Sequence, residues 1–490
     1  MRLEPLIAKL IYIDERSEGR DKIYSTKIMD FNTEVLKYKD DFLKDLNTLV
    51  SYESVRDEST KAENAPFGKN CRDVLDAMLD MAKRDGFETK DVDGYAGVVE
   101  YGQGEETFGV LGHLDIVPLG EGWTKDPLKV TLENGYIFGR GVMDDKGPAL
   151  AGYYALKMIR DLNIPLKKRV MLITGCDEES GMECMKYYVD HAEVPQMGFV
   201  PDANFPVIYG EKGGLHVGLV SKDATVIKKL HAGSRPNIVI GKADVTVDVM
   251  SYQQEDLFKF YCATQGVKGN IKRGEEGVTL HIDGAFAHAA MPYNGVNAAV
   301  LLLNFIGEAY NDQLSKDLYF LLKDWMGKPV GIEKVGLYMS FLTMNTGIVK
   351  MENNETDILI DIRYPNDTNA DEIMAKFDEA CAGLTSNIKA ENRGDSKPLF
   401  VDPDSRLVKD LMSVYQKYTG DTFSCPITIG GGTYARKFEN FVSYGPELPN
   451  EVIETDAFVG GCHQRDEGIK LDNLLQAICI YADAIVTLCS

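Results

Sequence analysis

Two histidines stand beside carboxylates in patterns that suit metal binding. His113 lies in GHLDIVP, two residues before Asp115, at the end of an apolar run. Because residues i and i+2 of a strand point to the same face, Asp115 could hold the imidazole of His113 in place. His463 lies in GGCHQRDEG, after two glycines and before an apolar segment. Alone, either histidine could equally be a hydrogen-bonded residue of a strand end or a polar loop.

Carboxylates follow other apolar segments. Asp144 and Asp145 lie in GRGVMDDKGP, just before an expected helix, where acids are commonly helix caps. Glu178 and Glu179 follow the apolar run KRVMLITG, and Asp202 follows the short run GFVP. A solvated turn explains any one of these acids. Since open α/β sheets place their ligands at the carboxyl ends of strands, we expect the acids to meet at one edge of a sheet.

Together these residues form a donor set for divalent cations. Nitrogen and carboxylate ligands without thiolate suit Zn²⁺ best, with Mn²⁺ and Co²⁺ as alternatives. Three protein ligands per ion leave coordination positions open, as in catalytic sites. Asp144, Glu179 and Asp202 supply negative charges that would repel one another without cations. Two divalent cations and one hydroxide would balance them, so the expected cofactors are two divalent metal ions.

The composition fits a globular enzyme with small ligands. The 490 residues suggest two or three domains, and a 44% hydrophobic, 26% charged chain excludes disorder and fibres. The formal net charge of −23 argues against nucleic acid and anionic membranes as partners. Nine scattered cysteines without C-x-x-C favour a reducing cytoplasm. The sequence pattern predicts neither a signal peptide nor an apolar run of the roughly 18 to 20 residues that cross a membrane, so we expect a cytoplasmic protein.

Strand and helix patterns alternate from about residue 39. The Asn134-Gly135 pair predicts a tight hairpin inside 130–139. Strands separated by helices indicate a mostly parallel sheet covered by helices. The apolar spacing predicts helices over 40–55, 70–87 and 147–163, and strands over 95–101, 107–118, 168–175 and 198–203.

The pattern changes near Gly210. The segments HVGLV, ADVTVDVM, GVTLHID and TDILIDIRYP alternate apolar and polar residues, which is typical of half-exposed antiparallel strands. Two predicted helices, 295–310 and 370–383, lie among them. This α+β region is expected to end near residue 396, at the polar linker NRGDSKP. A helix over 405–418, strands over 426–432 and 441–445, and a helix over 471–488 then return to the α/β pattern.

The simplest organisation is one α/β catalytic domain interrupted by an inserted α+β lid. Residues 1–28 are an N-terminal extension of unassigned role. The catalytic domain comprises 29–212 and 397–490, and the lid comprises 213–396.

Five motifs, in this order and spacing, resemble the dinuclear metallopeptidase family of carboxypeptidase G and bacterial dipeptidases. They are GHLDIVP, GRGVMDDKGP, DEES, VPDANFP with YGEKG, and CHQRDE. IGGGTYAR, AHAAMP and DIRYP make the chain most similar to the PepV-type dipeptidases, also called Xaa-His or β-Ala-Xaa dipeptidases. The resemblance covers about residues 40–490. It implies a zinc-exopeptidase-like catalytic domain with an inserted lid.

The resemblance also assigns the metal ligands. Asp144 would bridge the two ions, and the peptide bond after it would be cis. His113 and Asp202 would complete the shell of one ion. Glu179 and His463 would complete the shell of the other.

Two further residues receive catalytic roles from the resemblance. Asp115 would orient His113, and Glu178 would be the general base and acid. This agrees with the chemistry of amide hydrolysis, in which two neighbouring cations acidify a water and polarise the scissile carbonyl. Glu178 would take the proton of that water and later deliver it to the leaving amine.

The inserted lid would supply contacts to the substrate. His288 in GAFAHAAMP resembles a lid histidine that reaches the oxyanion, although a surface loop histidine is the plain alternative. Arg363 in DIRYP resembles the residue that clamps the substrate carboxylate, a task that suits the paired donors of a guanidinium. Asn237 resembles another lid contact.

Three glycines and the length of the lid carry the remaining expectations. Gly430, Gly431 and Gly432 would let backbone N–H groups approach the C-terminal carboxylate of the substrate, or they form an ordinary turn. The PepV-type lid is enlarged and supplies its own histidine, which implies a monomer. We therefore expect a monomeric, metal-dependent dipeptidase acting on small peptides.

Two other functions remain open from the sequence. A deacylase or amidohydrolase for N-acyl amino acids could use the same metal site. The alternative that is not an enzyme is a metal-dependent binding module that has lost catalysis. The presence of Glu178 counts against that module, since a binder needs no acid that does not ligate.

Overall fold

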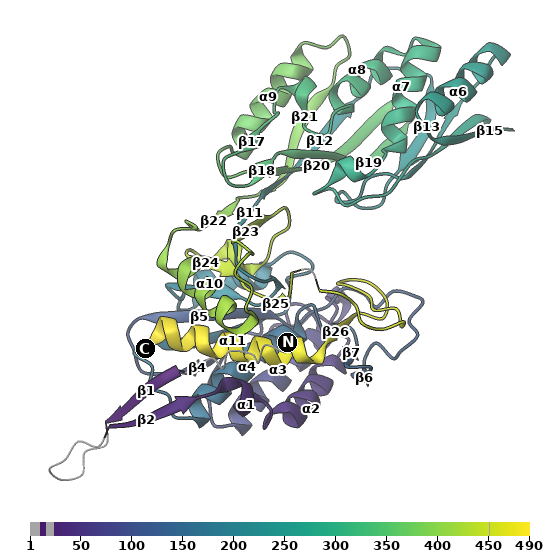
Figure 1. Ribbon diagram of the computed structural model, residues 1–490. Coiled ribbons are helices and arrows are strands. Elements are labelled where there is room, and N and C mark those ends of the chain that lie inside the picture. The colour runs from purple at the N-terminus through teal and green to yellow at the C-terminus, as the bar shows by residue number, and fades with distance from the viewer. Residues whose placement is uncertain (1–9, 16–23, 450) are drawn as a thin grey trace, which may run out of the picture. The chain divides into compact units, whose positions relative to one another are not determined.

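The computed structural model describes residues 10–15, 24–449 and 451–490, with side chains from residue 30 onward. The chain forms two compact units (Figure 1). Unit 1 comprises the residues up to Tyr209, Val401–Ile427 and Thr433–Ser490, and unit 2 comprises Gly210–Phe400 and Thr428–Gly432. The expected lid began at 213 and ended at 396. It also lacked residues 428–432, which belong to unit 2. One contact there is the Lys212 N–H, which donates to the Ile429 carbonyl at 2.9 Å.

A nine-stranded sheet has the order β22-β11-β24-β9-β5-β8-β4-β3, and β23 pairs with β11. The strands β24, β9, β5 and β8 are parallel to one another, and the outer pairs are antiparallel. The α/β class is confirmed, with parallel pairing confined to these central strands. The strands are β3 (Glu88–Val92), β4 (Ala96–Tyr101), β5 (Thr107–His113), β8 (Arg169–Gly175), β9 (Met197–Val200), β11 (Ile208–Glu211), β22 (Leu399–Phe400), β23 (Ile427–Ile429) and β24 (Phe441–Ser443).

Helices pack on this sheet because its central strands are apolar on both faces. Gly152 lets helix α4 approach the sheet closely, since a Cβ there would lie 3.0 Å from Val110. The helices of unit 1 are α1 (Phe31–Val35), α2 (Lys39–Val50), α3 (Lys69–Arg84), α4 (Lys146–Asp161), α5 (Glu183–His191), α10 (Arg406–Thr419) and α11 (Leu471–Cys489).

Helix α11 corrects one sequence expectation. It is 19 residues long and apolar enough to cross a membrane by length and composition, a run that the sequence reading overlooked. However, 83% of its most apolar window is buried inside the structure. Its Asp483 is also buried and pairs with Lys417 at 2.5 Å. The hydrophobicity of α11 is therefore explained by its place in the core of unit 1.

Short strand pairs outside the main sheet complete unit 1. The expected hairpin is confirmed as β6 (Thr131–Glu133) and β7 (Tyr136–Phe138), and its Asn134 and Gly135 both have positive φ, 52° and 81°. Strand β26 (Gly468–Lys470) pairs with β7, and β10 (Ala203–Asn204) pairs with β25 (Pro446–Glu447). In the expected extension, β1 (Leu10–Glu15) and β2 (Tyr24–Met29) pair antiparallel.

Unit 2 is an antiparallel sheet with the order β15-β16-β14-β13-β19-β20-β12-β21, and helices α6 to α9 cover one face of it (Figure 1). Its strands are β12 (Gly213–Ser221), β13 (Ile227–Ala232), β14 (Lys242–Val247), β15 (Lys268–Gly274), β16 (Gly277–Asp283), β19 (Thr343–Glu352), β20 (Glu355–Tyr364) and β21 (Lys389–Ser396), with β17 (Val335–Gly336) and β18 (Ser340–Phe341) as a separate pair. Its helices are α6 (Tyr252–Thr264), α7 (Ala298–Tyr310), α8 (Gln313–Leu322) and α9 (Ala370–Ala382).

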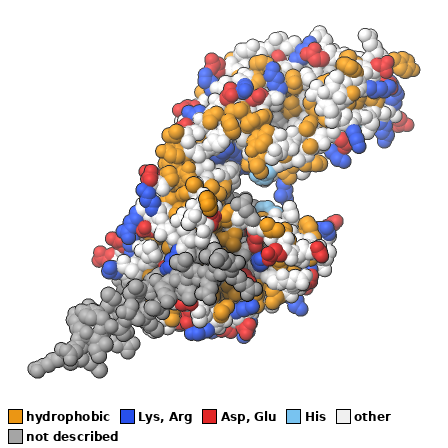
Figure 2. Space-filling model, viewed as in Figure 1, with side chains coloured by type: hydrophobic (Ala, Val, Ile, Leu, Met, Phe, Trp, Pro, Cys, Tyr) orange, Lys and Arg blue, Asp and Glu red, His pale blue; other side chains and the backbone are white. Residues whose placement is uncertain are grey.

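Two expectations for unit 2 were wrong in detail. Helices α6 and α8 were missed; α6 buries only Phe258 and Cys262, which leaves little periodic signal. The segment expected to be a linker is part of strand β21, at the edge of the sheet. An edge strand tolerates charged side chains, and this explains the polar composition. On the visible face, charged side chains of both signs are interspersed with apolar ones (Figure 2).

Candidate metal centre

Three adjacent parallel strands bring the predicted site residues to one edge of the sheet. His113 is the last residue of β5 and lies opposite Gly175, the last residue of β8. Glu178 and Glu179 follow β8, and Asp202 follows β9, the other neighbour of β5. Because carboxyl ends of parallel strands meet at the same edge, these side chains converge.

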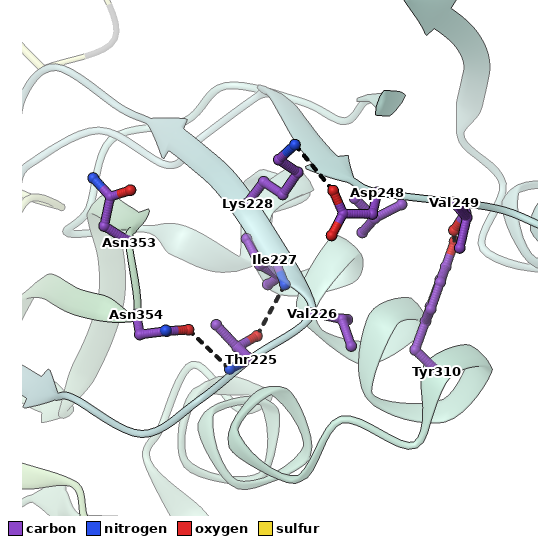
Figure 3. Close-up of a pocket in the computed structure, with 10 residues that line it drawn as sticks. Thr225, Val226, Ile227, Lys228, Asp248, Val249, Tyr310, Asn353 and Asn354 are labelled. Carbon is purple, nitrogen blue, oxygen red and sulfur yellow. Dashed lines mark hydrogen bonds and ion pairs between the residues drawn. The ribbon is translucent and has the colours of Figure 1, made fainter. Parts of the chain in front are cut away.

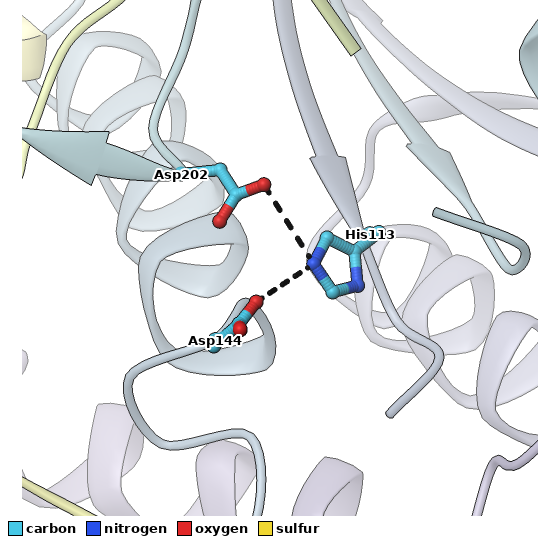
Figure 4. Close-up of side chains that lie close together, drawn as sticks. All are labelled: His113, Asp144 and Asp202. Carbon is cyan, nitrogen blue, oxygen red and sulfur yellow. Dashed lines mark hydrogen bonds and ion pairs between the residues drawn. The ribbon is translucent and has the colours of Figure 1, made fainter. Parts of the chain in front are cut away.

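The first cluster, here called the first triad, consists of His113, Asp144 and Asp202 (Figure 4). The Nε2 atom of His113 lies 3.0 Å from Asp144 Oδ1 and 3.7 Å from Asp202 Oδ2. His113 is buried, whereas the two carboxylates are partly exposed. Their donor atoms all lie within 4.8 Å of one another, a spacing that can hold a metal ion.

The second triad consists of Asp144, Glu179 and His463. The Nε2 atom of His463 lies 3.0 Å from Asp144 Oδ2 and 3.0 Å from Glu179 Oε1. Asp144 therefore offers Oδ1 to one histidine and Oδ2 to the other. A carboxylate with its two oxygens divided in this way can bridge two cations. The structure thus brings together all five residues that the sequence proposed as ligands.

Asp145 and Asp115 hold His113 in place. Asp145 Oδ2 accepts the backbone N–H of His113 at 2.9 Å, and the peptide bond between Asp144 and Asp145 is cis, as expected. The nearest partner of His113 Nδ1 is the carbonyl oxygen of Asp115, at 3.0 Å. The Asp115 carboxylate lies 3.5 Å from that nitrogen. Asp115 thus orients His113 mainly through its carbonyl group, which presents Nε2 to the triad.

The carboxylate of Asp115 has a further role that the sequence pattern does not reveal. Its Oδ1 and Oδ2 accept the backbone N–H groups of Glu178 and Glu179, each at 3.1 Å. Asp115 is fully buried. One carboxylate therefore fixes both glutamates of the DEES turn.

The electrostatics of the centre reflect many acids around two histidines. Hydrogen bonds that His463 donates to the carboxylates of Asp144 and Glu179 raise the pKa of His463 to about 10. Burial raises the pKa of Asp202 well above its usual range, with neighbouring carboxylates adding to the effect. Burial and the charges of Glu179 and Asp144 raise the pKa of Glu178 to about 8. This crowding of negative charge is relieved when cations occupy such a donor set.

Two other residues of the centre had no role in the sequence reading. The ring of Tyr434 packs edge-on to His113, with centroids 6.1 Å apart, and its hydroxyl lies 2.9 Å from Cys184 Sγ. Glu467 is fully buried beside the Asp144 loop. Both stand inside the quoted motifs, IGGGTYAR and CHQRDE. An aromatic residue after glycines and an acid before Gly468 are the signals that could have marked them.

Two of the expected lid residues, His288 and Asn237, lie together in unit 2, and Gly430 lies beside them. Ile238 forms a β-bridge with His288, and the Ala289 N–H donates to the Asn237 carbonyl at 2.9 Å. The segment carrying Asn237 is fixed by buried Asn345, whose Nδ2 donates to Ile238 at 3.1 Å. A Cβ atom at Gly430 would lie 2.8 Å from the Ala290 side chain. The glycine turn therefore approaches the His288 segment closely.

Arg363 has a different environment from the one expected. Its Nε and Nη2 atoms donate to the two carboxylate oxygens of Asp361, at 2.7 and 2.8 Å. Asp361 is fully buried. The paired donors expected to hold a substrate carboxylate are thus bound to a neighbouring side chain on β20.

Unit 2 also contains a cavity of about 510 Å³ beside β13 (Figure 3). Its polar groups pair with one another: Lys228 Nζ lies 2.9 Å from Asp248 Oδ1, and the Thr225 N–H donates to Asn354 Oδ1 at 3.3 Å. None of the described lining residues is a candidate site residue.

Comparisons with known proteins agree with this geometry. The model of the family described as "Peptidase family M20/M25/M40" matches residues 109–487. A Bacillus subtilis relative, "Putative dipeptidase YtjP", is 36% identical over 476 residues, 94% of this chain and 100% of the relative. The fold resembles human carnosine dipeptidase 1 (TM-score 0.53, 13% identity, 94% and 98% of the two chains covered). It also resembles the dipeptidase Dug1p of Saccharomyces cerevisiae (TM-score 0.54, 13% identity, 93% and 97% covered).

Proposed function

Because the chain belongs to peptidase family M20/M25/M40, we propose that it is a metal-dependent dipeptidase that hydrolyses the peptide bond of small peptides. The relative from Bacillus subtilis named as a dipeptidase supports the substrate class. The observation that carries the proposal is the pair of triads that share Asp144.

The donor set fits two divalent cations. His113 and Asp202 would hold one ion, Glu179 and His463 the other, and Asp144 would bridge them. Imidazole nitrogens and carboxylate oxygens without thiolate favour Zn²⁺, with Mn²⁺ and Co²⁺ as alternatives. When bound, such a pair lowers the pKa of a water and polarises a carbonyl group.

Glu178 is proposed as the general base and acid. It belongs to neither triad, yet its backbone is held by Asp115 at the point where Glu179 enters the second triad. Glu178 accepts the proton of the attacking water and returns it to the leaving amine, since amide cleavage needs both transfers.

The lid residues are proposed to contact the substrate. His288 Nδ1 accepts the Ala290 N–H at 3.1 Å, which places the ring proton on Nε2. That N–H can donate to an oxyanion. Asn237 and Gly430 lie beside this segment within unit 2. Their backbone N–H groups, with those of Gly431 and Gly432 that follow, are proposed to add hydrogen bonds. We further propose that the protein is a monomer, because the enlarged lid carries its own histidine. Its nine scattered cysteines without C-x-x-C support a cytoplasmic location.

The test is a substrate panel with the apo protein reloaded separately with Zn²⁺, Mn²⁺ and Co²⁺. The panel contains free dipeptides, C-terminally amidated dipeptides and N-acyl amino acids. Dipeptides should react at least tenfold faster, by kcat/KM, than N-acyl amino acids. Faster hydrolysis of the N-acyl compounds would instead make the protein a deacylase. If the apo protein hydrolyses dipeptides as fast as the metal-loaded protein, the proposed metal dependence is overturned.

A further inference from the structure

We infer that Glu467 is a positioning residue that fixes the second triad by tying the loop of Asp144 to the loop of His463. The inference rests on the proposed function, since it concerns how this chain holds the metal ions assigned to the two triads. Glu467 lies four residues after His463 and is fully buried.

The carboxylate of Glu467 takes up donors from the loop that carries Asp144. Its Oε1 accepts the backbone N–H groups of Gly141 and Met143 at 3.0 Å each, and that of Asp144 at 3.3 Å. Its Oε2 accepts Arg140 Nη1 at 2.7 Å. A buried carboxylate with one cationic and three amide donors is held rigidly, because breaking any contact leaves a buried polar group unpaired.

Arg140 extends this arrangement to a third loop. Its side chain is 2% exposed, and its Nη2 donates to the carbonyl of Leu119 at 3.2 Å. The guanidinium also lies over the ring of Trp123, 5.0 Å from the centroid. On the other side, Asp466 Oδ1 accepts the Thr124 N–H at 2.8 Å. Glu467 thus joins the loops around residues 139–144 and 460–467, and Arg140 and Asp466 connect both of them to the loop around residues 119–125.

The loop of His463 is closed tightly next to Glu467. The Gly460 N–H donates to the Asp466 carbonyl at 2.8 Å, and the Gly468 N–H donates to the Gly460 carbonyl at 3.0 Å. His463 itself has φ 64°, in the left-handed region. A displacement of Glu467 is therefore transmitted to His463 through a short closed loop.

The first triad is anchored differently. His113 ends strand β5, and Asp202 follows β9 in the same sheet. Asp144 stays connected to His113 through the next residue, Asp145, whose carboxylate accepts the His113 N–H at 2.9 Å. Loss of Glu467 should consequently weaken the ion of the second triad and spare the ion of the first.

The test measures the affinities of both sites in Glu467→Gln by titrating the apo protein with Zn²⁺ against a chelator. The amide oxygen of glutamine can still accept the backbone N–H groups, but its NH₂ faces Arg140. We expect the Zn²⁺ affinity assigned to the second triad to fall at least tenfold. The affinity assigned to the first triad should change less than threefold. The visible spectrum of the Co²⁺ protein should change at one ion only.

Two further variants separate positioning from general stability. Glu467→Gln with Arg140→Met removes the clash of donors and should restore part of the lost affinity. Asp45→Asn is the matched control, because Asp45 is buried and accepts Arg84 Nη1 and Nη2 at 2.9 and 2.8 Å outside the triads. It should lower Tm and leave both affinities unchanged. Glu467→Asp, which keeps the charge, replaces Glu467→Gln if the latter does not fold.

The outcomes distinguish this inference from the proposed function. Unchanged affinities in the Glu467 variants, or an equal loss at both sites, would overturn the positioning role. If the parent protein binds two ions but cleaves no dipeptide, the proposed function fails while the selective loss still supports Glu467. If the parent binds no ion, both fail.

Discussion

The Asp115 carboxylate accepts the backbone N–H of Glu178 at 3.1 Å, while its other oxygen accepts that of Glu179 at the same distance. The fixed turn lets two adjacent glutamates take different directions. Glu179 reaches His463 in the second triad, and Glu178 does not join either triad. One buried acid thereby separates a proposed ligand from the proposed base.

Replacing the proposed base should abolish turnover without removing metal. Glu178→Gln keeps the size of the side chain but cannot accept the proton of a water, so kcat should fall by roughly 10²- to 10⁴-fold. Metal content, measured by elemental analysis after dialysis, should equal that of the parent. Glu183→Gln is the control, since Glu183 is half-exposed on α5. A near-parental rate for Glu178→Gln would remove the residue from the mechanism.

Asp115→Asn should disturb both glutamates together. One oxygen of the carboxylate becomes an NH₂ group that faces a backbone N–H, so one of the two contacts is lost. Loss of such an outer contact weakens metal binding by about 10- to 100-fold. Chelator competition and kcat should both report the change. Asp57→Asn removes an exposed carboxylate that also accepts a backbone N–H, from Ser59, and should alter neither measurement.

His463→Ala should remove one ion and retain the other. His463 contributes to the second triad only, whereas His113 and Asp202 remain in place. Elemental analysis after dialysis should fall from two ions per chain toward one. His191→Ala, which changes a histidine on α5 outside both triads, should leave the stoichiometry unchanged. Full occupancy of both sites in His463→Ala would contradict its assignment.

Arg363→Ala should have two separable effects. Because Asp361 is buried and its other partner, His216, lies 3.9 Å away, removal of Arg363 leaves its charge poorly compensated. The free energy of unfolding should fall by about 3–5 kcal/mol. If Arg363 also clamps a substrate carboxylate, KM should rise for free dipeptides more than for amidated ones. Arg393→Ala, which removes a more exposed pair with Asp357, should leave KM unchanged. A KM rise that is equal for both substrates would leave Arg363 with its structural role alone.

Much of the site could be predicted from the sequence because His113, Glu179 and Asp202 each end or follow an apolar run. Parallel strands with apolar faces end at a common edge, so the strand pattern alone places His113, Glu179 and Asp202 together. The contact between Arg363 and Asp361 was also within reach, since residues i and i+2 of a strand share a face.

Other features depend on packing that no local pattern reveals. The carboxylates of Asp115 and Glu467 accept backbone N–H groups, which are the same for every residue type. The edge strand β21 looked like a linker because its exposed side chains are polar. Helix α6 was missed because it buries few residues, and α11 was overlooked as an apolar run although its core position requires one.

The most direct measurement is X-ray diffraction from crystals of the Zn²⁺-loaded protein, with data collected on both sides of the zinc absorption edge. Two anomalous peaks should appear, one within the first triad and one within the second, with Asp144 between them. The absence of anomalous density at both triads, or peaks held by other residues, would contradict the proposed metal centre and the hydrolysis assigned to it.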